Sequence, residues 1–153
     1  MYKLRPRFHY TPKCGYMNDP NGLVYDKQNG IYHLYYQYQE ELIPRSCLVR
    51  WGHAQSDNLV DWKEEEPILM PDDYGIIMSG SAVVDKENSS GLFDCSTPKD
   101  MRFVAFYASG ILGGRQAIAL AYSSDGFNYK KYNGGAPILY NNEVEFNSDF
   151  RDA

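Results

Sequence analysis

Two stretches of this sequence resemble each other and decide the fold. The first is Ser56-Asp57-Asn58-Leu59-Val60-Asp61-Trp62-Lys63, followed by Pro67-Ile68-Leu69, and the second is Ser124-Asp125-Gly126-Phe127-Asn128-Tyr129-Lys130, followed by Pro137-Ile138-Leu139. The offset is 68 residues between the serines and 70 between the prolines. Self-similarity at a fixed period indicates a repeat architecture, and a period of roughly 70 residues suits a four-stranded propeller blade with long loops. Coincidence between two strand-turn-strand units is the alternative.

The rest of the chain reads as short strands and turns, with no convincing helix. Residues 22–26 and 31–39 flank a Lys-Gln-Asn-Gly turn, a pattern typical of a β-hairpin. Further strands are predicted at residues 79–84, 103–109 and 116–122. Turn signals separate these segments at short intervals, which predicts an all-β fold of the sandwich, barrel or propeller type.

The composition excludes several classes of function. The 153 residues are 43% hydrophobic and 23% charged, which is ordinary for one soluble globular domain. The formal net charge is −5 and no long basic run occurs, so we expect no nucleic-acid or membrane partner. No apolar stretch approaches the length of a transmembrane helix, and residues 1–6 lack the apolar core of a signal peptide. We therefore expect a cytoplasmic protein.

Cysteines and histidines show no metal-binding pattern. Cys14, Cys47 and Cys95 are widely spaced and odd in number, so free thiols are expected rather than a disulfide framework. The three histidines, His9, His33 and His53, also lack metal spacing, and structural roles are expected for them. We expect neither a metal ion nor another cofactor.

The run Gly15-Tyr16-Met17-Asn18-Asp19-Pro20-Asn21-Gly22-Leu23 is the strongest candidate for a functional site. Pro20 fixes its own φ and biases Asp19 toward an extended conformation. Asn21-Gly22 is a strong tight-turn pair. The pattern predicts an Asp19 held rigidly at a strand end, as a nucleophilic carboxylate requires. On composition alone, a plain turn explains the same residues.

This run, with residues 5–12 before it, resembles the N-terminus of glycoside hydrolase family 32, which contains invertases, levanases, inulinases and sucrose-6-phosphate hydrolases. The likeness continues in the family's order through residues 32–38, 51–62, 79–85 and 150–152. The resemblance implies a five-bladed β-propeller with its active site at the axial funnel. This chain would then cover about the first two blades and the start of the third, so that residues 1–153 form the N-terminal part of the catalytic domain.

The resemblance also implies roles for individual residues. Asp19 matches the catalytic nucleophile, and Asp152 matches the aspartate that binds fructose hydroxyls and stabilises the transition state. The positions implied in binding a small or oligosaccharide fructoside are Asn18, Gln37, Trp51, Ser81 and Arg151. Two residues depart from the family pattern: Tyr16 stands where a tryptophan is usual, and Ala153 where a proline is usual.

The implied reaction is retaining hydrolysis of terminal β-D-fructofuranosides, for which two carboxyl groups lie about 5–5.5 Å apart. The family's general acid is a glutamate before a cysteine, and no Glu-Cys pair occurs in this sequence. The glutamates present have no context that argues for a raised pKa, and the acidic run Glu64–Glu66 reads as a solvated loop. We expect little turnover from this chain alone, because losing a general acid costs about 10²–10⁴-fold in rate.

Other interpretations stay open at this point. A truncated relic could keep Asn18, Asp19, Gln37 and Asp152 as a fructoside-binding surface without hydrolysis. A related five-bladed glycosidase acting on pentosans is a third possibility, against which the Asn-Asp-Pro-Asn-Gly run argues. The sequence does not distinguish sucrose, sucrose phosphate, levan and inulin as substrates. A phosphate-binding cluster would need basic side chains, for which the candidates are Arg45, Arg50 and Arg115.

Overall fold

The computed structural model describes residues 5–6, 8–40, 49–110, 116–141 and 150–152 of the chain. These residues contain nine β-strands and two short 3₁₀ helices but no α-helix. The all-β expectation is therefore confirmed. Among these residues, no helix has the length and apolar character needed to cross a membrane.

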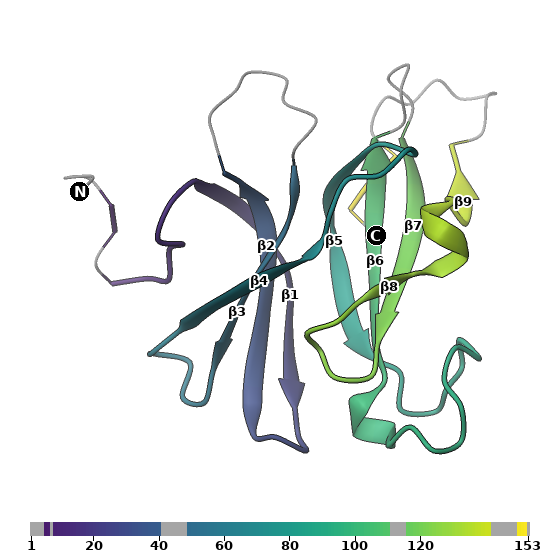
Figure 1. The fold of residues 1–153 in the computed structure, drawn as a ribbon, viewed down its shortest axis with the longest axis horizontal. Helices are drawn as coiled ribbons and strands as arrows, with labels where there is room; N and C mark the ends of the chain where they lie inside the picture. The colour runs from purple at the N-terminus through teal and green to yellow at the C-terminus, as the bar shows by residue number, and fades with distance from the viewer. Residues whose placement is uncertain (1–4, 7, 41–48, 111–115, 142–149, 153) are drawn as a thin grey trace.

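The strands form two antiparallel sheets that stand side by side (Figure 1). In the first sheet the strands follow one another in chain order: β1 (Tyr16–Asp26), β2 (Ile31–Gln39), β3 (Arg50–Ser56) and β4 (Lys63–Leu69). The second sheet repeats this order with β5 (Ile76–Val84), β6 (Phe103–Gly110), β7 (Gln116–Ser123) and β8 (Lys130–Lys131), while β9 (Leu139–Tyr140) pairs with β7. The 3₁₀ helices are η1 (Lys99–Met101) and η2 (Tyr132–Gly135).

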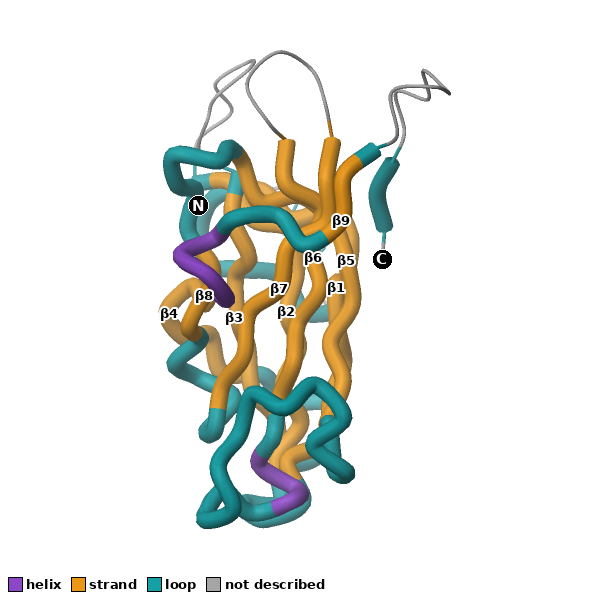
Figure 2. Tube along the Cα trace, turned by 90° about the vertical axis from the view of Figure 1, so that its right-hand side faces the viewer, coloured by secondary structure: helices purple, strands orange, loops and turns teal. Residues whose placement is uncertain are grey.

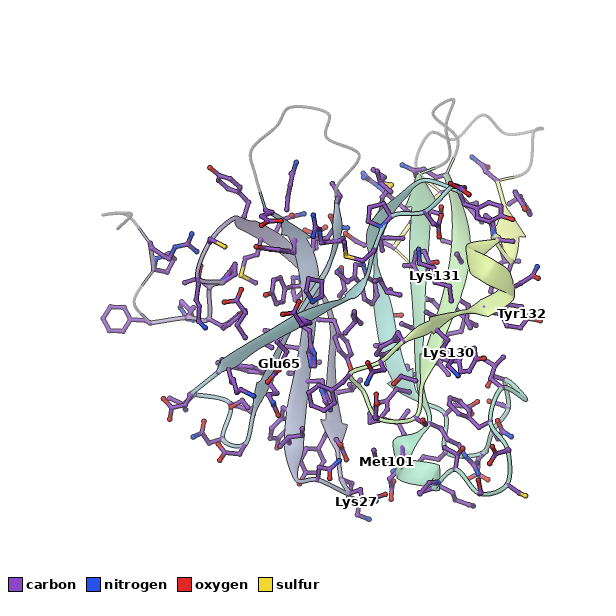
Figure 3. All side chains as sticks on the ribbon, viewed as in Figure 1. Lys27, Glu65, Met101, Lys130, Lys131 and Tyr132 are labelled. Atoms are coloured by element: carbon purple, nitrogen blue, oxygen red, sulfur yellow. The ribbon has the colours of Figure 1, made fainter. Side chains whose placement is uncertain are left out.

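The first strands of the two sheets, β1 and β5, lie next to each other and begin at the same end of the molecule (Figures 1 and 2). They approach so closely that a Cβ on Gly22 would lie 2.7 Å from the Cβ of Ala82. The opposite end holds the β1–β2 turn with Lys27 and the helix η1 with Met101 (Figure 3). Between the sheets, a core of large side chains is removed from water, which favours their association; it includes Tyr35, Trp51, Leu69, Ile77, Phe103 and Tyr107.

The predicted hairpin and strands are confirmed. Asp26 pairs with Ile31 across the Lys-Gln-Asn-Gly turn. The segments predicted at 79–84, 103–109 and 116–122 lie in β5, β6 and β7. Cys14 and Cys95 are free, as expected, and Cys47 lies outside the described residues.

The internal repeat is confirmed as well, but its serine register was wrong by one residue. Ser56 Oγ accepts a hydrogen bond from Leu59 N at 2.8 Å, and Ser123 Oγ, not that of Ser124, accepts one from Gly126 N at 3.0 Å. The next residues continue the match, because Asn58 Oδ1 and Asp125 Oδ1 each accept two backbone N–H groups. The true offset in these turns is 67 residues, and η2 lies in the extra residues that bring the proline offset to 70.

The expected tight turn at Asn21-Gly22 was wrong. Residues 16–26 form one continuous strand, with register shifts between Met17 and Pro20 and between Pro20 and Gly22. Pro20 has no N–H for the ladder, so the strand bulges there instead of turning. Asn21 is buried, with 2% of its surface exposed, and ladder pairs on both sides keep the chain extended. Asp19 thus lies within the bulged strand rather than at its end.

The acidic run Glu64–Glu66 is also not a loop. It belongs to β4, the outermost strand of its sheet, where Glu65 is labelled in Figure 3. The Glu65 carboxylate accepts a hydrogen bond from Gln55 on β3 and pairs with Lys63 at 2.6 Å. An outermost strand tolerates charged residues because one of its edges and part of its surface stay in water.

Candidate functional site

The Asp19 carboxylate lies at the junction of the two sheets. Its side chain is exposed, and Ser79 Oγ donates a 2.6 Å hydrogen bond to Asp19 Oδ2. Asp19 belongs to β1 and Ser79 to β5, so the contact joins the first strand of one sheet to the first strand of the other. A hydroxyl hydrogen bond to a carboxylate at this length is charge-assisted and strong. It holds one carboxylate oxygen in a fixed position while the side chain remains accessible.

An irregularity in β5 sets the position of Ser79. The pairing of β5 with β6 shifts register between Ile77 and Gly80. A Cβ on Gly80 would lie 2.0 Å from the carbonyl oxygen of Phe106, so this approach of the two strands requires glycine. The register shift changes the direction of the side chains that precede Gly80, as β-bulges do next to functional sites.

A buried hydrogen-bond network around Asn21 lies behind Asp19. When the Asn21 amide is oriented so that its oxygen faces the two neighbouring donors, this oxygen accepts from Gln37 N at 3.0 Å and from Trp51 Nε1 at 2.9 Å. The single N–H of Trp51 Nε1 is shared between this oxygen and the carbonyl oxygen of Met78, which lies 2.8 Å away. Gln37 Nε2 donates to the carbonyl oxygen of Ile77 at 3.0 Å. Gln37 and Trp51 therefore hold the β5 backbone immediately before Ser79, and the sheets are tied together at this point.

The remaining candidates on β1, β2, β3 and β5 differ in accessibility. Asn18 is exposed beside Asp19, whereas Gln37 is 6% exposed and Trp51 is fully buried. Ser81 is partly buried and pairs with Phe106 in the ladder. Their roles in binding substrate stay predictions. Because Trp51 has no exposed surface here, its influence on a bound sugar would pass through Asn21 and Met78.

Arg151 and Asp152 come from a separate segment. Residues 150–152 lie beside β5, on the side of the sheets formed by the first strands (Figures 1 and 2). Both side chains are exposed, and Arg151 Nε lies 3.9 Å from Asp152 Oδ2. Asp152 adopts φ of 62°, a left-handed conformation that is uncommon for residues other than glycine. The structure thus presents a second carboxylate on the side where β1 and β5 begin their sheets.

Comparison with known proteins identifies the family. The sequence model of the glycosyl hydrolases family 32 N-terminal domain matches residues 9–153. The chain belongs to glycoside hydrolase family 32. An invertase from Schizosaccharomyces pombe is 41% identical over an alignment of 148 positions, which covers 93% of this chain and 25% of the invertase. A levanase from Bacillus subtilis is 44% identical over 149 residues, or 97% of this chain and 20% of the levanase.

The solved structures of family 32 agree with this fold. A fructofuranosidase from Schwanniomyces occidentalis, solved in complex with fructose, superposes with a TM-score of 0.80 at 42% identity. The match covers 89% of this chain and 27% of the fructofuranosidase. The two sheets are early blades of the five-bladed β-propeller of the family, and the chain spans about a quarter of the length of these relatives.

Two residues depart from the family 32 pattern. Tyr16 begins β1, and its ring is 44% exposed, three residues before Asp19. The position therefore keeps an exposed aromatic residue on the strand that carries Asp19. Ala153 lies outside the described residues.

The structure describes one of the three arginines considered for phosphate binding. Arg50 lies 3.7 Å from Glu40 in an ion pair, and Arg45 and Arg115 lie outside the described residues. Within the described ranges, no three side chains of the metal-ligating types come together.

The sequence interpretation missed Ser79 and Asn21. Within Ser79-Gly80-Ser81, the predicted site residue was Ser81. The register shift beside Gly80 instead brings the hydroxyl of Ser79 within hydrogen-bonding distance of Asp19. Asn21 was assigned to a turn, whereas its buried amide links β1 to β2 and β3. A glycine between two serines in a strand was the available signal, because an isolated glycine in a strand often marks a bulge.

Proposed function

We propose that the protein containing this chain hydrolyses terminal β-D-fructofuranosides, such as sucrose or fructans, with retention of configuration. The observation that carries the proposal is the exposed Asp19 carboxylate, fixed across the two blades by Ser79. The named activities of the relatives support it, as does the fructose bound to the Schwanniomyces occidentalis fructofuranosidase.

In this proposal Asp19 is the nucleophile. One of its oxygens attacks the anomeric C2 of the fructosyl unit, and the bond from C2 to the leaving oxygen breaks as a general acid donates a proton to that oxygen. Water then attacks C2 and gives a proton to the deprotonated acid, while the bond from C2 to Asp19 breaks and releases fructose and the free carboxylate. The acid must be a second carboxyl group, which the family pattern places in a Glu-Cys pair that this sequence does not contain.

The other site residues hold the sugar and the nucleophile. Asp152 binds fructose hydroxyls as positive charge develops at C2, and Asn18, Ser81 and Arg151 provide further polar groups for the fructosyl unit. Gln37 and Trp51 keep the backbone at Ile77 and Met78 in place, and Ser79 thereby stays within hydrogen-bonding distance of Asp19. Such positioning contributes to rate because the reacting groups are already oriented before the chemical step.

Methanolysis tests the reaction class. The full-length protein is incubated with sucrose in a water–methanol mixture, and the methyl fructosides, which unlike free fructose do not mutarotate, are analysed by NMR. Retention predicts methyl β-D-fructofuranoside, because methanol intercepts the fructosyl-enzyme on the face from which the leaving group departed. Methyl α-D-fructofuranoside as the initial product would exclude a covalent intermediate on Asp19.

A fructoside-binding protein without turnover is the second candidate. Binding a fructoside needs only accessible polar side chains and no general acid, and Asn18, Asp19 and Asp152 are all exposed. Calorimetric titration with sucrose and short fructans, run beside a fructose-release assay, separates the two. Saturable binding without any fructose release supports the binding protein, and steady release supports the hydrolase.

A further inference from the structure

A buried histidine pair lies outside the machinery described above. His33 Nδ1 and His53 Nε2 are 2.9 Å apart, and the two residues are 0% and 1% exposed. The remaining ring nitrogens, His33 Nε2 and His53 Nδ1, have no hydrogen-bond partner among the described residues. His33 Nε2 lies 3.8 Å from Oδ2 of Asp26, which is also fully buried.

These contacts assign the protons of the neutral pair. Two neutral imidazoles carry two N–H groups, and one of them must lie between the rings. If His53 Nε2–H donates to His33 Nδ1, the proton of His33 sits on Nε2 and faces the Asp26 carboxylate. The reverse arrangement would bury an N–H of His53 without an acceptor and turn the lone pair of His33 Nε2 toward Asp26. Both rings are therefore Nε2–H tautomers, because this arrangement turns the remaining buried N–H toward a carboxylate 3.8 Å away, and an N–H next to an acceptor charge is favoured over one that faces no acceptor.

The pair lies where the second blade packs on the first. His33 and His53 belong to β2 and β3, and the turn between β7 and β8 covers them. The Phe127 ring meets both imidazoles edge-on, at centroid distances of 4.9 and 5.1 Å. Gly126 packs so closely that a Cβ there would lie 2.7 Å from His33 Nε2. We call this contact between the histidine pair and Gly126-Phe127 the seam.

The charged groups near the pair come from three elements. Asp26 from β1, Glu65 from β4 and Asp125 from the β7–β8 turn all act on the histidines. Burial nevertheless lowers the pKa of His33, and burial together with neighbouring His33 lowers the pKa of His53 to about 3. The acidic neighbours therefore do not offset the loss of hydration.

We propose that the His33–His53 pair is an acid-labile latch: a proton added to the pair opens the seam and separates the blades that carry Asp19 and Ser79. The inter-ring hydrogen bond is already formed in the neutral pair, so an added proton on His53 Nδ1 finds no acceptor among the residues that the structure describes. A buried charge without a partner is expelled to water, and the turn that covers the rings must move for water to reach it.

Acid is expected to destabilise the closed seam, because the two histidines bind protons more weakly there than in the unfolded chain. Unfolded or open chains bind a proton on each histidine below about pH 6.5, whereas the closed seam does not. The seam contributes its full share to the free energy of unfolding above that pH. This contribution falls as the pH drops toward the pKa of the histidines in the folded state. For His53 alone, the equilibrium constant for opening rises by more than about tenfold between pH 7 and pH 4.5.

Urea unfolding at several pH values tests the latch. Wild-type protein is compared with His53→Gln, which removes one titrating ring, and with His9→Gln, which changes an exposed histidine as a matched control. Between pH 7 and 4.5, we expect the unfolding equilibrium constant of the wild type to increase by a factor more than about ten times that of His53→Gln. His9→Gln should show the same increase as the wild type. Equal pH dependence in all three proteins would overturn the proposal.

Hydrogen exchange in the wild-type protein provides a second test, which does not require His53→Gln to fold. Wild-type amides in β2, β3 and the β7–β8 turn are followed between pH 7 and 4.5 after correction for intrinsic exchange rates, with β6 as the internal reference. Selective loss of protection in the seam supports the latch. Protection that stays constant, or that falls equally in β6, contradicts it.

Discussion

Ser79 donates a 2.6 Å hydrogen bond to Asp19 across 60 residues of sequence, from the first strand of one blade to the first strand of the other. The candidate nucleophile is therefore positioned by the neighbouring blade. A site built across two blades depends on how those blades pack, and Gln37 and Trp51 fix that packing next to Ser79.

Replacing Ser79 by alanine removes the hydroxyl that holds the Asp19 carboxylate. A hydrogen bond to a charged group contributes about 1.5–3 kcal/mol, so we expect Ser79→Ala to lower kcat/KM by about 10–100-fold. The loss should fall mainly on kcat, because the orientation of the nucleophile matters most in the transition state. Steady-state kinetics with sucrose in the full-length protein measure the effect.

Ser109→Ala is the matched control for this experiment. Ser109 is also a strand serine, and its hydroxyl donates to the carbonyl oxygen of Tyr74 in the turn before β5. The same atom is lost without a contact to Asp19, so kinetics close to wild type are expected. Similar losses in both variants would show that Ser79 acts through stability alone.

Replacing Asn21 by alanine removes the acceptor of the buried network. Gln37 N loses its Asn21 partner, while Trp51 Nε1 keeps its contact with Met78. We expect a loss of about 1–3 kcal/mol in the free energy of unfolding, measured by urea titration. The exposed Asn128, which bonds Asp125 at 2.8 Å, provides the control Asn128→Ala, with a change within about 0.5 kcal/mol. An Asn21→Ala variant as stable as the control would refute the network.

Leu59 and Gly126 occupy the same position in the two equivalent turns, and we expect substitutions there to have opposite effects on stability. Leu59 adopts φ of 63° and Gly126 adopts φ of 75°, although only glycine is unstrained there. Leu59 is 45% exposed, so Leu59→Gly loses little burial and should stabilise the protein by about 0.5–1 kcal/mol. Gly126→Ala should destabilise it by about 1–3 kcal/mol, because the new Cβ would meet His33 at 2.7 Å.

Thermal and urea unfolding of both variants check this pair of predictions. A stabilised Leu59→Gly beside a destabilised Gly126→Ala confirms that the turns share a backbone but differ in what covers them. Changes of the same sign at both positions would show that the turns are not equivalent.

Much of the fold could be predicted from local sequence signals. The Lys-Gln-Asn-Gly turn and the alternating strands define the first hairpin, and the two similar stretches define a repeat unit of one blade. The register of the repeat could not be read from residue identity, because Ser123 and Ser124 are adjacent and only the hydrogen bond to Gly126 N selects between them.

The site was harder to predict because it depends on contacts between blades. Asn21-Gly22 has strong turn propensity, yet the ladder with β2 and the burial of Asn21 override it. Ser79 and Ser81 look equivalent in the sequence, and only the shifted register beside Gly80 directs Ser79 to Asp19. In both cases tertiary contacts, which one sequence does not display, outweighed local preference.

The substitution Asp19→Asn tests the central claim most directly. It keeps the size of the side chain and its acceptor toward Ser79 but removes the carboxylate that would bond to C2. Fructose release from sucrose by the full-length protein should fall by at least about 10³-fold, while the urea unfolding midpoint stays near that of the wild type. Turnover close to wild type in Asp19→Asn would contradict the assignment of Asp19 as the nucleophile.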